Sequence, residues 1–204
     1  MILDLVVLAA DKSTEEAVHG LLGRPQAIGI RPIVYTIVRH PHKDPGCYHR
    51  PEGFLLPYAG DTDHALVIFD RAWEGVPEAE PQELGRHVEE RLRPAWGDRA
   101  RTVVIDPELE IWVWSDSPNV DKVLGWTGHE PPLRVWLEER GYWPRNALKP
   151  PNPKRAYLEA LEEVRQQKSS SNFRNLAGTV GLSRCGDPSF TRLREILQEW
   201  FGRV

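Results

Sequence analysis

The chain has 204 residues, of which 40% are hydrophobic and 27% are charged, enough to bury one full core. Its net charge of -4 excludes the strongly basic average surface typical of many nucleic-acid-binding proteins. The apolar stretch at residues 1–10 is interrupted by Asp4 and is too short to span a bilayer, so we expect a strand there and no membrane association. Cys47 and Cys185 lie far apart, and a domain of this size needs no disulfide, so we expect a reducing, cytoplasmic location.

The first half of the sequence alternates apolar runs with amphipathic segments. Short apolar runs rich in β-branched residues are typical of strands buried on both faces of a parallel sheet. The expected strands are residues 3–9, 30–38, 65–69 and 102–105. Helical spacing predicts one helix capped by Ser13 or Thr14, another over residues 81–93 and a third after Pro107. This alternation predicts an α/β, Rossmann-like fold with a mainly parallel four-stranded sheet flanked by helices.

The second half is predicted to be helical. Apolar spacing indicates helices over residues 132–140, 153–166, 172–180 and 188–201, separated by Pro, Gly or Ser. We therefore expect an α/β domain over residues 1–142 and a helical C-terminal extension over residues 143–204, packed on that domain. Residues 40–63, rich in Pro, Gly and His, are expected to form a long loop.

Charge is divided unevenly between these two parts. From Pro144 onward there are 11 basic and 6 acidic residues, whereas the preceding part has 15 basic and 24 acidic residues. An acidic first part and a basic second part are compatible with a metal site beside a phosphate-facing surface. Two ordinary solvated helical surfaces of unequal charge explain the same numbers.

Carboxylates follow the predicted strands at the points where the strands end. Ligands of α/β proteins bind at the carboxyl edge of the sheet, so these side chains are the first candidates for a site. They are Asp11 and Glu15, Asp70 and Glu74, Asp106, Glu108 and Glu110, and Asp116. Several converging carboxylates repel one another unless a hard cation or shared protons neutralise them, which points to Mg²⁺ or Mn²⁺. Capping of helix N-termini by each acid separately is the alternative.

Three short motifs resemble those of Toprim-like proteins. ADKSTEEAVHGLL after the first strand is similar to the acidic opening of these proteins, and VIFD to their third strand with its acidic end. VVIDPELEIWVWSD resembles the ELEAW signature of a Toprim-like family of bacterial proteins of unknown function, which is followed by NPK and PSF segments as here. The chain is also similar to the small Toprim-like component of methylation-associated antiphage defence systems.

The resemblance implies a role for each matching residue. It places the family's acidic positions on Asp11, Glu15, Asp70, Glu108 and Glu110. On this basis we expect catalytic roles for Asp11, Glu15, Asp70 and Glu108 and metal binding by Asp11, Asp70, Glu74, Glu108 and Glu110. We further expect nucleic-acid contacts by Lys12, Lys154 and Arg155. Two positions depart from the family pattern. Asp11 and Lys12 replace the usual Glu and Gly, and Ala72 replaces the second acid of an Asp-x-Asp pair. Ala72 removes a metal ligand unless Glu74 reaches the site.

The leading hypothesis is a Toprim-like component of a bacterial antiphage defence system, a Mg²⁺-dependent phosphodiesterase or nuclease acting on nucleic acid. The alternative is a catalytically inactive Toprim-like scaffold that binds a protein partner in a defence or methylation complex. A small-molecule phosphotransferase is disfavoured, because no Gly-rich run follows a strand. Other defence-system proteins are the expected partners, and the sequence leaves substrate and oligomeric state open.

A second cluster of potential metal ligands lies in the predicted loop. HPHKDPGCYH places His40, His42, Cys47 and His49 within ten residues. Their spacing matches no standard zinc pattern, and all four ligands would come from one irregular segment. An exposed loop in which these residues are incidental is therefore the favoured interpretation, with zinc as the alternative.

Overall fold

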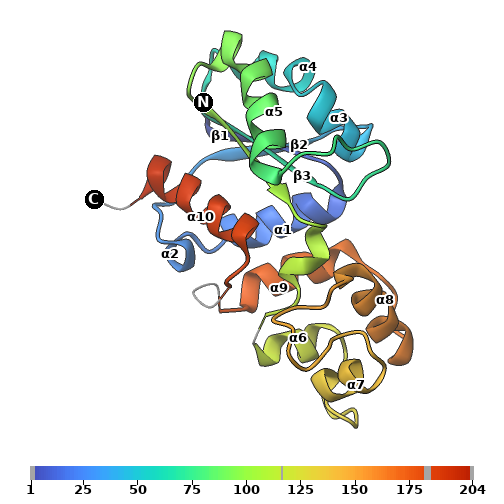
Figure 1. Cartoon of the computed structure of the whole chain (residues 1–204). Helices are drawn as coiled ribbons and strands as arrows, with labels where there is room; N and C mark the ends of the chain where they lie inside the picture. Colours follow the sequence, from blue (N-terminus) through green and yellow to red (C-terminus); the bar gives the residue numbers. More distant parts are fainter. Residues whose placement is uncertain (1–2, 116, 182–184, 203–204) are drawn as a thin grey trace.

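The computed structural model describes residues 3–115, 117–181 and 185–202. Its centre is a four-stranded sheet in the order β2-β1-β3-β4, and all three strand pairs are parallel. The strands are β1 (Leu3–Ala9), β2 (Tyr35–Arg39), β3 (Thr62–Asp70) and β4 (Ala100–Ile105). The chain therefore has the predicted α/β, Rossmann-like fold, with helices flanking the sheet and a helical C-terminal part (Figure 1).

Helices fill the connections and the C-terminal part. In the first half they are α1 (Lys12–Leu22), α2 (Pro25–Ile28), α3 (Lys43–His49), α4 (Glu52–Leu55), the 3₁₀ helix η1 (Leu56–Tyr58) and α5 (Pro81–Trp96). After β4 come the 3₁₀ helix η2 (Leu109–Trp112), α6 (Pro118–Val123), α7 (Leu133–Glu139), α8 (Pro153–Glu163), α9 (Ser170–Thr179) and α10 (Pro188–Phe201).

Each face of the sheet is covered by its own hydrophobic core. Successive side chains of a strand point to opposite faces, so Leu5 and Val7 enter one core while Val6 and Leu8 enter the other. The first core includes apolar residues of α1, α9 and α10 and continues into α6, α7 and α8. The second core is formed with α3 and α5. The strands are thus buried on both faces, which explains their nearly continuous apolar sequences.

The helical part is attached to the sheet mainly through α9, which packs along α1. In Figure 1 the sheet with α3, α4 and α5 occupies the upper part of the view, and α6, α7 and α8 form the lower part. Helix α10 returns to the sheet and packs on β4. The boundary proposed between residues 142 and 143 stays a prediction, although α6 and α7 already pack against α9 and α8.

Four local predictions were wrong. The second strand begins at Tyr35 instead of residue 30, because Ile30 forms a bridge with Gly202 and Pro32 has no N–H for a sheet ladder. Helix α1 is capped by Asp11, not by Ser13 or Thr14. Residues 40–63 form α3, α4 and η1 in place of a long loop. The segment after Pro107 forms only the short 3₁₀ helix η2.

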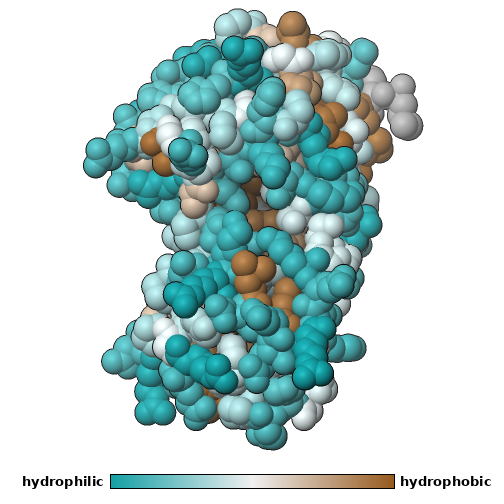
Figure 2. All heavy atoms as spheres, turned by 90° about the vertical axis from the view of Figure 1, so that its right-hand side faces the viewer, coloured by the Kyte–Doolittle hydropathy of each residue, from teal (hydrophilic) through white to brown (hydrophobic). Residues whose placement is uncertain are grey.

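The molecular surface is mainly hydrophilic. The face shown in Figure 2 narrows between its upper and lower parts and carries small, separate hydrophobic patches. Among the described residues, no helix has both the length and the apolar character needed to cross a membrane.

The close approach of α1 and α9 gives a stability prediction. A Cβ at Gly20 of α1 would lie 2.5 Å from the Arg174 carbonyl oxygen and 2.8 Å from the Ala177 Cβ. Gly20→Ala should therefore separate the two helices and lower the free energy of unfolding by about 1–3 kcal/mol, as measured by urea denaturation. Gly178→Ala in α9, where a Cβ would meet nothing within 4 Å, is the control and should raise stability by roughly 0.5–1 kcal/mol. Equal effects of the two substitutions would contradict tight packing at Gly20.

Candidate functional site

The carboxyl ends of β1 and β3 lie side by side at the centre of the sheet. From β1 the chain first adds β2 on one side, and then crosses to the other side of β1 to form β3. Such a reversal of strand order leaves a crevice at the carboxyl edge, where α/β proteins bind ligands. The N–H of Ala10 donates to the carbonyl of Ile68 at 3.2 Å, which holds the two strand ends together. Asp11 follows β1 and Asp70 ends β3, so both lie at this carboxyl edge, and we call the position between the two strand ends the crevice.

Asp70 carries an unusual carboxylate. Its Oδ1 atom is buried and has no hydrogen-bond partner in the described structure. Burial raises the pKa of Asp70 well above its usual value, and the negative charges of Asp44, Glu110 and Asp11 raise it further. The backbone amide of Leu109 opposes this shift. An acceptor oxygen buried without a donor and surrounded by like charge is the arrangement that a cation or a proton would stabilise.

Asp44 is a member of the site that the sequence analysis did not identify. It lies in the first turn of α3, and its Oδ1 accepts a hydrogen bond from the Asp70 N–H at 2.8 Å. Burial raises the pKa of Asp44, the hydrogen bond from Asp70 opposes the rise, and the charge of Asp11 adds to it. The segment that was predicted to be a long loop therefore places a third aspartate beside the ends of β1 and β3.

Asp11 is placed by its role as a helix cap. Its Oδ1 accepts hydrogen bonds from the Thr14 N–H at 2.9 Å and the Thr14 hydroxyl at 3.0 Å, which fixes the start of α1. Capping of this kind was the alternative interpretation of the strand-end acids. For Asp11 the cap is observed, and the capping carboxylate also acts electrostatically on Asp44 and Asp70.

Two lysines from the helical part reach the acids that follow β4. Lys154 of α8 lies 2.8 Å from a Glu108 carboxylate oxygen, and Lys168 lies 3.2 Å from one of Glu110. Both glutamates are buried, with exposed fractions of 9% and 4%. Burial would lower the pKa of Lys154, but the Glu108 hydrogen bond and the Glu110 and Asp70 charges together raise it. These pairs neutralise the glutamates, whereas none of the three aspartates has a lysine or arginine partner among the described residues.

Other predicted site residues form ion pairs with residues other than the three aspartates. Glu15 pairs with Lys12 at 3.1 Å and with Arg39 at 3.0 Å. Lys12 also pairs with Glu16 at 2.8 Å, which leaves it on the surface of α1. Arg155 is exposed and lies 3.7 Å from Glu159 on its own helix.

The remaining acids after the strands do not join the aspartates either. Glu74 is exposed in the segment between β3 and α5, two residues after Ala72. Asp106 is exposed and pairs with Arg71 at 3.1 Å. Asp116, another acid considered in the sequence, lies outside the described residues.

The histidine and cysteine cluster does not form an exposed loop. His40 and Cys47 are buried, and the His40 ring fills the space where a Cβ of Gly46 would be. Burial, together with the nearby Asp44 and Asp11 charges, raises the pKa of Cys47 and keeps its thiol protonated. His42 and His49 are exposed. The segment therefore contributes packing and positions Asp44, and both cysteines are free thiols.

The aspartates provide the right kind of donor for a hard cation. Carboxylate oxygens are preferred ligands of Mg²⁺ and Mn²⁺, and the unpartnered Asp70 Oδ1 is available. Within the described ranges, however, no three Asp, Glu, His or Cys side chains are grouped so that they could already hold a metal ion. Binding would therefore require side-chain adjustment at the crevice.

Comparison with known proteins identified no similar protein. No family model, curated protein or solved structure matches the chain. The interpretation of the crevice therefore depends on its geometry and on the motifs in the sequence.

The raised pKa of Asp70 predicts a pH-dependent effect of its removal. A carboxyl whose pKa is higher in the folded state contributes stability below about pH 4, and that contribution is lost as the pH rises through the folded-state value. Asp70→Asn should therefore stabilise the protein in chelator-containing buffer at pH 8, by about 1–3 kcal/mol, and much less at pH 4. Urea denaturation across this range measures the difference.

The matched control is Asp98→Asn, at an exposed carboxylate between α5 and β4. Its stability should differ from that of the wild type by a nearly constant amount between pH 4 and pH 8. An Asp70→Asn difference that is equally constant with pH would show that Asp70 has an ordinary pKa.

Proposed function

We propose that the crevice formed by Asp11, Asp44 and Asp70 binds Mg²⁺ or Mn²⁺ and serves phosphodiester chemistry on nucleic acid. The single observation that carries the proposal is the buried, unpartnered Asp70 Oδ1 beside two further aspartates at the reversal of strand order. A divalent ion would remove the mutual repulsion of these carboxylates, which a neutral ligand could not do.

The charge distribution around the crevice supports a phosphate ligand. Glu108 and Glu110 are already neutralised by Lys154 and Lys168, so the uncompensated negative charge belongs to the aspartates. Both lysines are about half exposed, with 46% and 43% of their side-chain surface accessible. Each ammonium can therefore donate to a phosphate oxygen while it remains near its glutamate.

The chain's own residues have separate roles in this proposal. Asp70 and Asp44 would hold the ion, and Asp11 would add negative charge while it fixes the start of α1. A bound divalent ion supplies Lewis acidity and stabilises charge on a phosphate oxygen. Lys154 and Lys168 would position the substrate through its phosphates. The resemblance to Toprim-like proteins favours nucleic acid as the substrate and an antiphage defence system as the setting, with other proteins of that system as partners.

A catalytically inactive scaffold is the second candidate function. Ala72 stands where a second acid of an Asp-x-Asp pair is expected, and Glu74 is exposed in the following segment, so it does not take the place of that acid. Among the predicted nucleic-acid contacts, Lys12 and Arg155 are held in local ion pairs on their own helices. A protein partner of a defence or methylation complex would be the ligand in that case.

Metal binding predicts a stability gain that depends on Asp70. An ion that binds only the folded state at about 100 times its Kd adds roughly 2.7 kcal/mol. For a chain of this size each kcal/mol raises the Tm by about 2–4 °C. We expect Mn²⁺ to raise the Tm of the wild type by several degrees and to leave that of Asp70→Asn nearly unchanged, as measured by calorimetry.

Two further variants sharpen this experiment. Asp98→Asn and Glu74→Gln should retain the full Mn²⁺ shift, because both carboxylates are exposed to solvent, unlike that of Asp70. If Asp70→Asn shows the same shift as the wild type, the ion binds elsewhere and the proposed site is wrong.

Catalysis is tested with 5′-labelled single-stranded and double-stranded oligonucleotides in the presence of Mn²⁺. We expect cleavage by the wild type, a loss of about 100-fold or more in Asp70→Asn and Asp44→Asn, and normal rates in Asp98→Asn. Lys154→Gln should weaken substrate binding, whereas Arg155→Gln, at the neighbouring exposed position, should not. An Asp70-dependent Mn²⁺ shift without any cleavage would support the scaffold function.

A further inference from the structure

The C-terminal end of α10 docks at the amino edge of the sheet, opposite to the edge that carries the crevice. Gly202, directly after α10, forms an antiparallel bridge with Ile30, and the Arg31 N–H donates to the Phe201 carbonyl at 2.9 Å. These bonds tie α10 to the segment between α2 and β2, and α10 also contacts α2 itself (Figure 1). The first residues of β3 lie at the same edge, so a side chain there can contact the last turn of α10.

His64 of β3 is a side chain that meets this turn. Its ring stacks on the ring of Trp200, with the centroids 4.3 Å apart and the planes inclined by 16°, and it meets the Phe201 ring edge-on at 5.4 Å. The Nδ1 atom of His64 is buried and has no hydrogen-bond partner among the described residues. A neutral imidazole suits these surroundings, because its unprotonated nitrogen is only an acceptor. A protonated ring would bury an N–H donor and a positive charge without an acceptor.

The cations near His64 also oppose its protonation. Burial lowers the pKa of His64 most, and the charges of Arg99 and Arg101 lower it further. The charge of Asp63 and the main chain of Arg99 act in the opposite direction but do not reverse the shift. The face of Trp200 would attract a protonated ring, which offsets only part of the cost of burying it.

The other charged groups at this edge are engaged with one another. Asp4 of β1 lies 2.6 Å from Arg31, and Glu199 of α10 lies 3.9 Å from Arg101. A protonated His64 would act on Asp4 through space, but neither carboxylate forms a hydrogen bond with the ring. The docked turn of α10 therefore offers His64 an aromatic stack and no proton acceptor.

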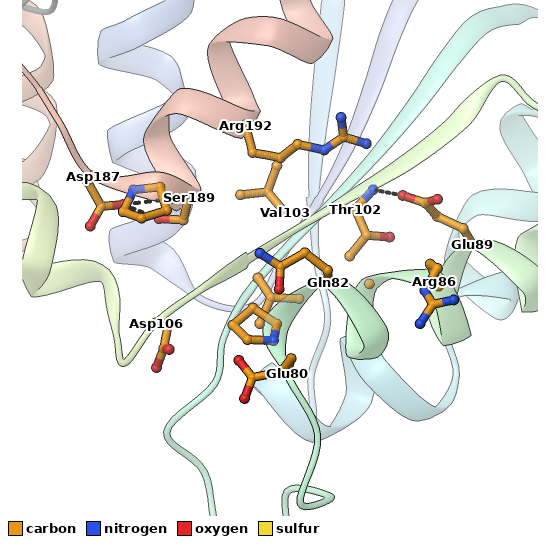
Figure 3. A pocket seen from close by; sticks show the side chains of 14 residues that line it. Glu80, Gln82, Arg86, Glu89, Thr102, Val103, Asp106, Asp187, Ser189 and Arg192 are labelled. Atoms are coloured by element: carbon orange, nitrogen blue, oxygen red, sulfur yellow. Dashed lines mark hydrogen bonds between the residues drawn. The ribbon is translucent and has the colours of Figure 1, made fainter.

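The side of α10 that faces α5 is open. A pocket of about 510 Å³ lies between the two helices beside β4, and Figure 3 shows Arg192 of α10 on one side of the strand and Arg86 of α5 on the other. The amino end of α10 is held separately, because its cap Asp187 accepts a hydrogen bond from the Trp112 Nε1 at 3.2 Å. The C-terminal turn can therefore leave the sheet without displacing α5 or the start of α10.

We propose that His64 and Trp200 form a pH-sensitive latch, in which protonation of the His64 ring releases the C-terminal turn of α10 from the sheet. In the released state water can hydrogen-bond to both ring nitrogens. Because the pKa of His64 is lower in the docked state, the latch contributes its full stability above about pH 6.5. That contribution is lost progressively as the pH falls from there to the docked-state value. This inference does not depend on the metal site.

Hydrogen exchange measured by NMR tests the latch in the intact protein. The amide of Arg31 reports docking directly, because its acceptor is the Phe201 carbonyl. We expect its protection factor to fall by about threefold or more between pH 7.5 and pH 5, in the direction set by the lowered pKa of His64. The amide of Val67, buried at the centre of β3, should keep its protection factor. The ring protons of His64 should titrate below the ordinary pKa of about 6.5.

Three variants complete the experiment. His64→Phe keeps a ring against Trp200 but cannot take up a proton, so the protection factor of Arg31 should be the same at both pH values. His87→Gln, at an exposed histidine of α5, is the matched control and should retain the fall seen in the wild type. Trp200→Leu removes the stacking partner, so the pKa of His64 should rise toward its ordinary value. This last variant tests the latch even if His64→Phe fails to fold.

Three results would overturn the proposal. The first is a wild-type His64 pKa at or above about 6.5. The second is a pH dependence of Arg31 protection that His64→Phe retains. The third is an equal loss of protection at Arg31 and Val67, which would mean global unfolding, as protonation of the buried His40 would also cause.

Discussion

The parallel pairing of β1 with β3 determines where every candidate residue of the crevice lies. Because this pair sits at the reversal of strand order, the segments that leave both strands must diverge, and the space between them is left for polar groups. Asp11 and Asp70 occupy the two strand ends. The N–H of Asp70 donates a hydrogen bond to the Asp44 carboxylate and so holds it beside them. The sheet thus brings two carboxylates together, and the packing of α3 adds the third.

The helical part completes this site instead of standing apart from it. It attaches through the close packing of α9 on α1, and its Lys154 and Lys168 reach back to the glutamates that follow β4. If these lysines were absent, two buried carboxylates would be added to the three aspartates, at a considerable electrostatic cost. Packing between the two parts and charge balance at the crevice are therefore linked.

Elements that depend on local sequence pattern could be predicted from the sequence. Elements that depend on contacts between distant residues could not. β1, β3 and β4 were recognisable as apolar runs, and the alternation of strands with helices placed Asp11, Asp70 and Glu108 at one edge. Asp44 could not be found, because the segment around it has low intrinsic helix propensity and folds through the burial of His40 and Cys47. The start of β2 was misplaced for a similar reason, since the partner of Ile30 is Gly202 at the other end of the chain.

The structure also changes the meaning of the uneven charge distribution. The excess of basic residues after Pro144 suggested a surface for phosphates, yet Lys154, Lys168 and Arg174 are paired with the acidic first part, to Glu108, Glu110 and Glu16. Arg184, also among these basic residues, lies outside the described residues. Much of the division is therefore internal compensation between two packed surfaces. Attraction for a nucleic acid would then come from a cation at the aspartates together with the half-exposed ammonium groups of Lys154 and Lys168, and not from the basic residues after Pro144 as a whole.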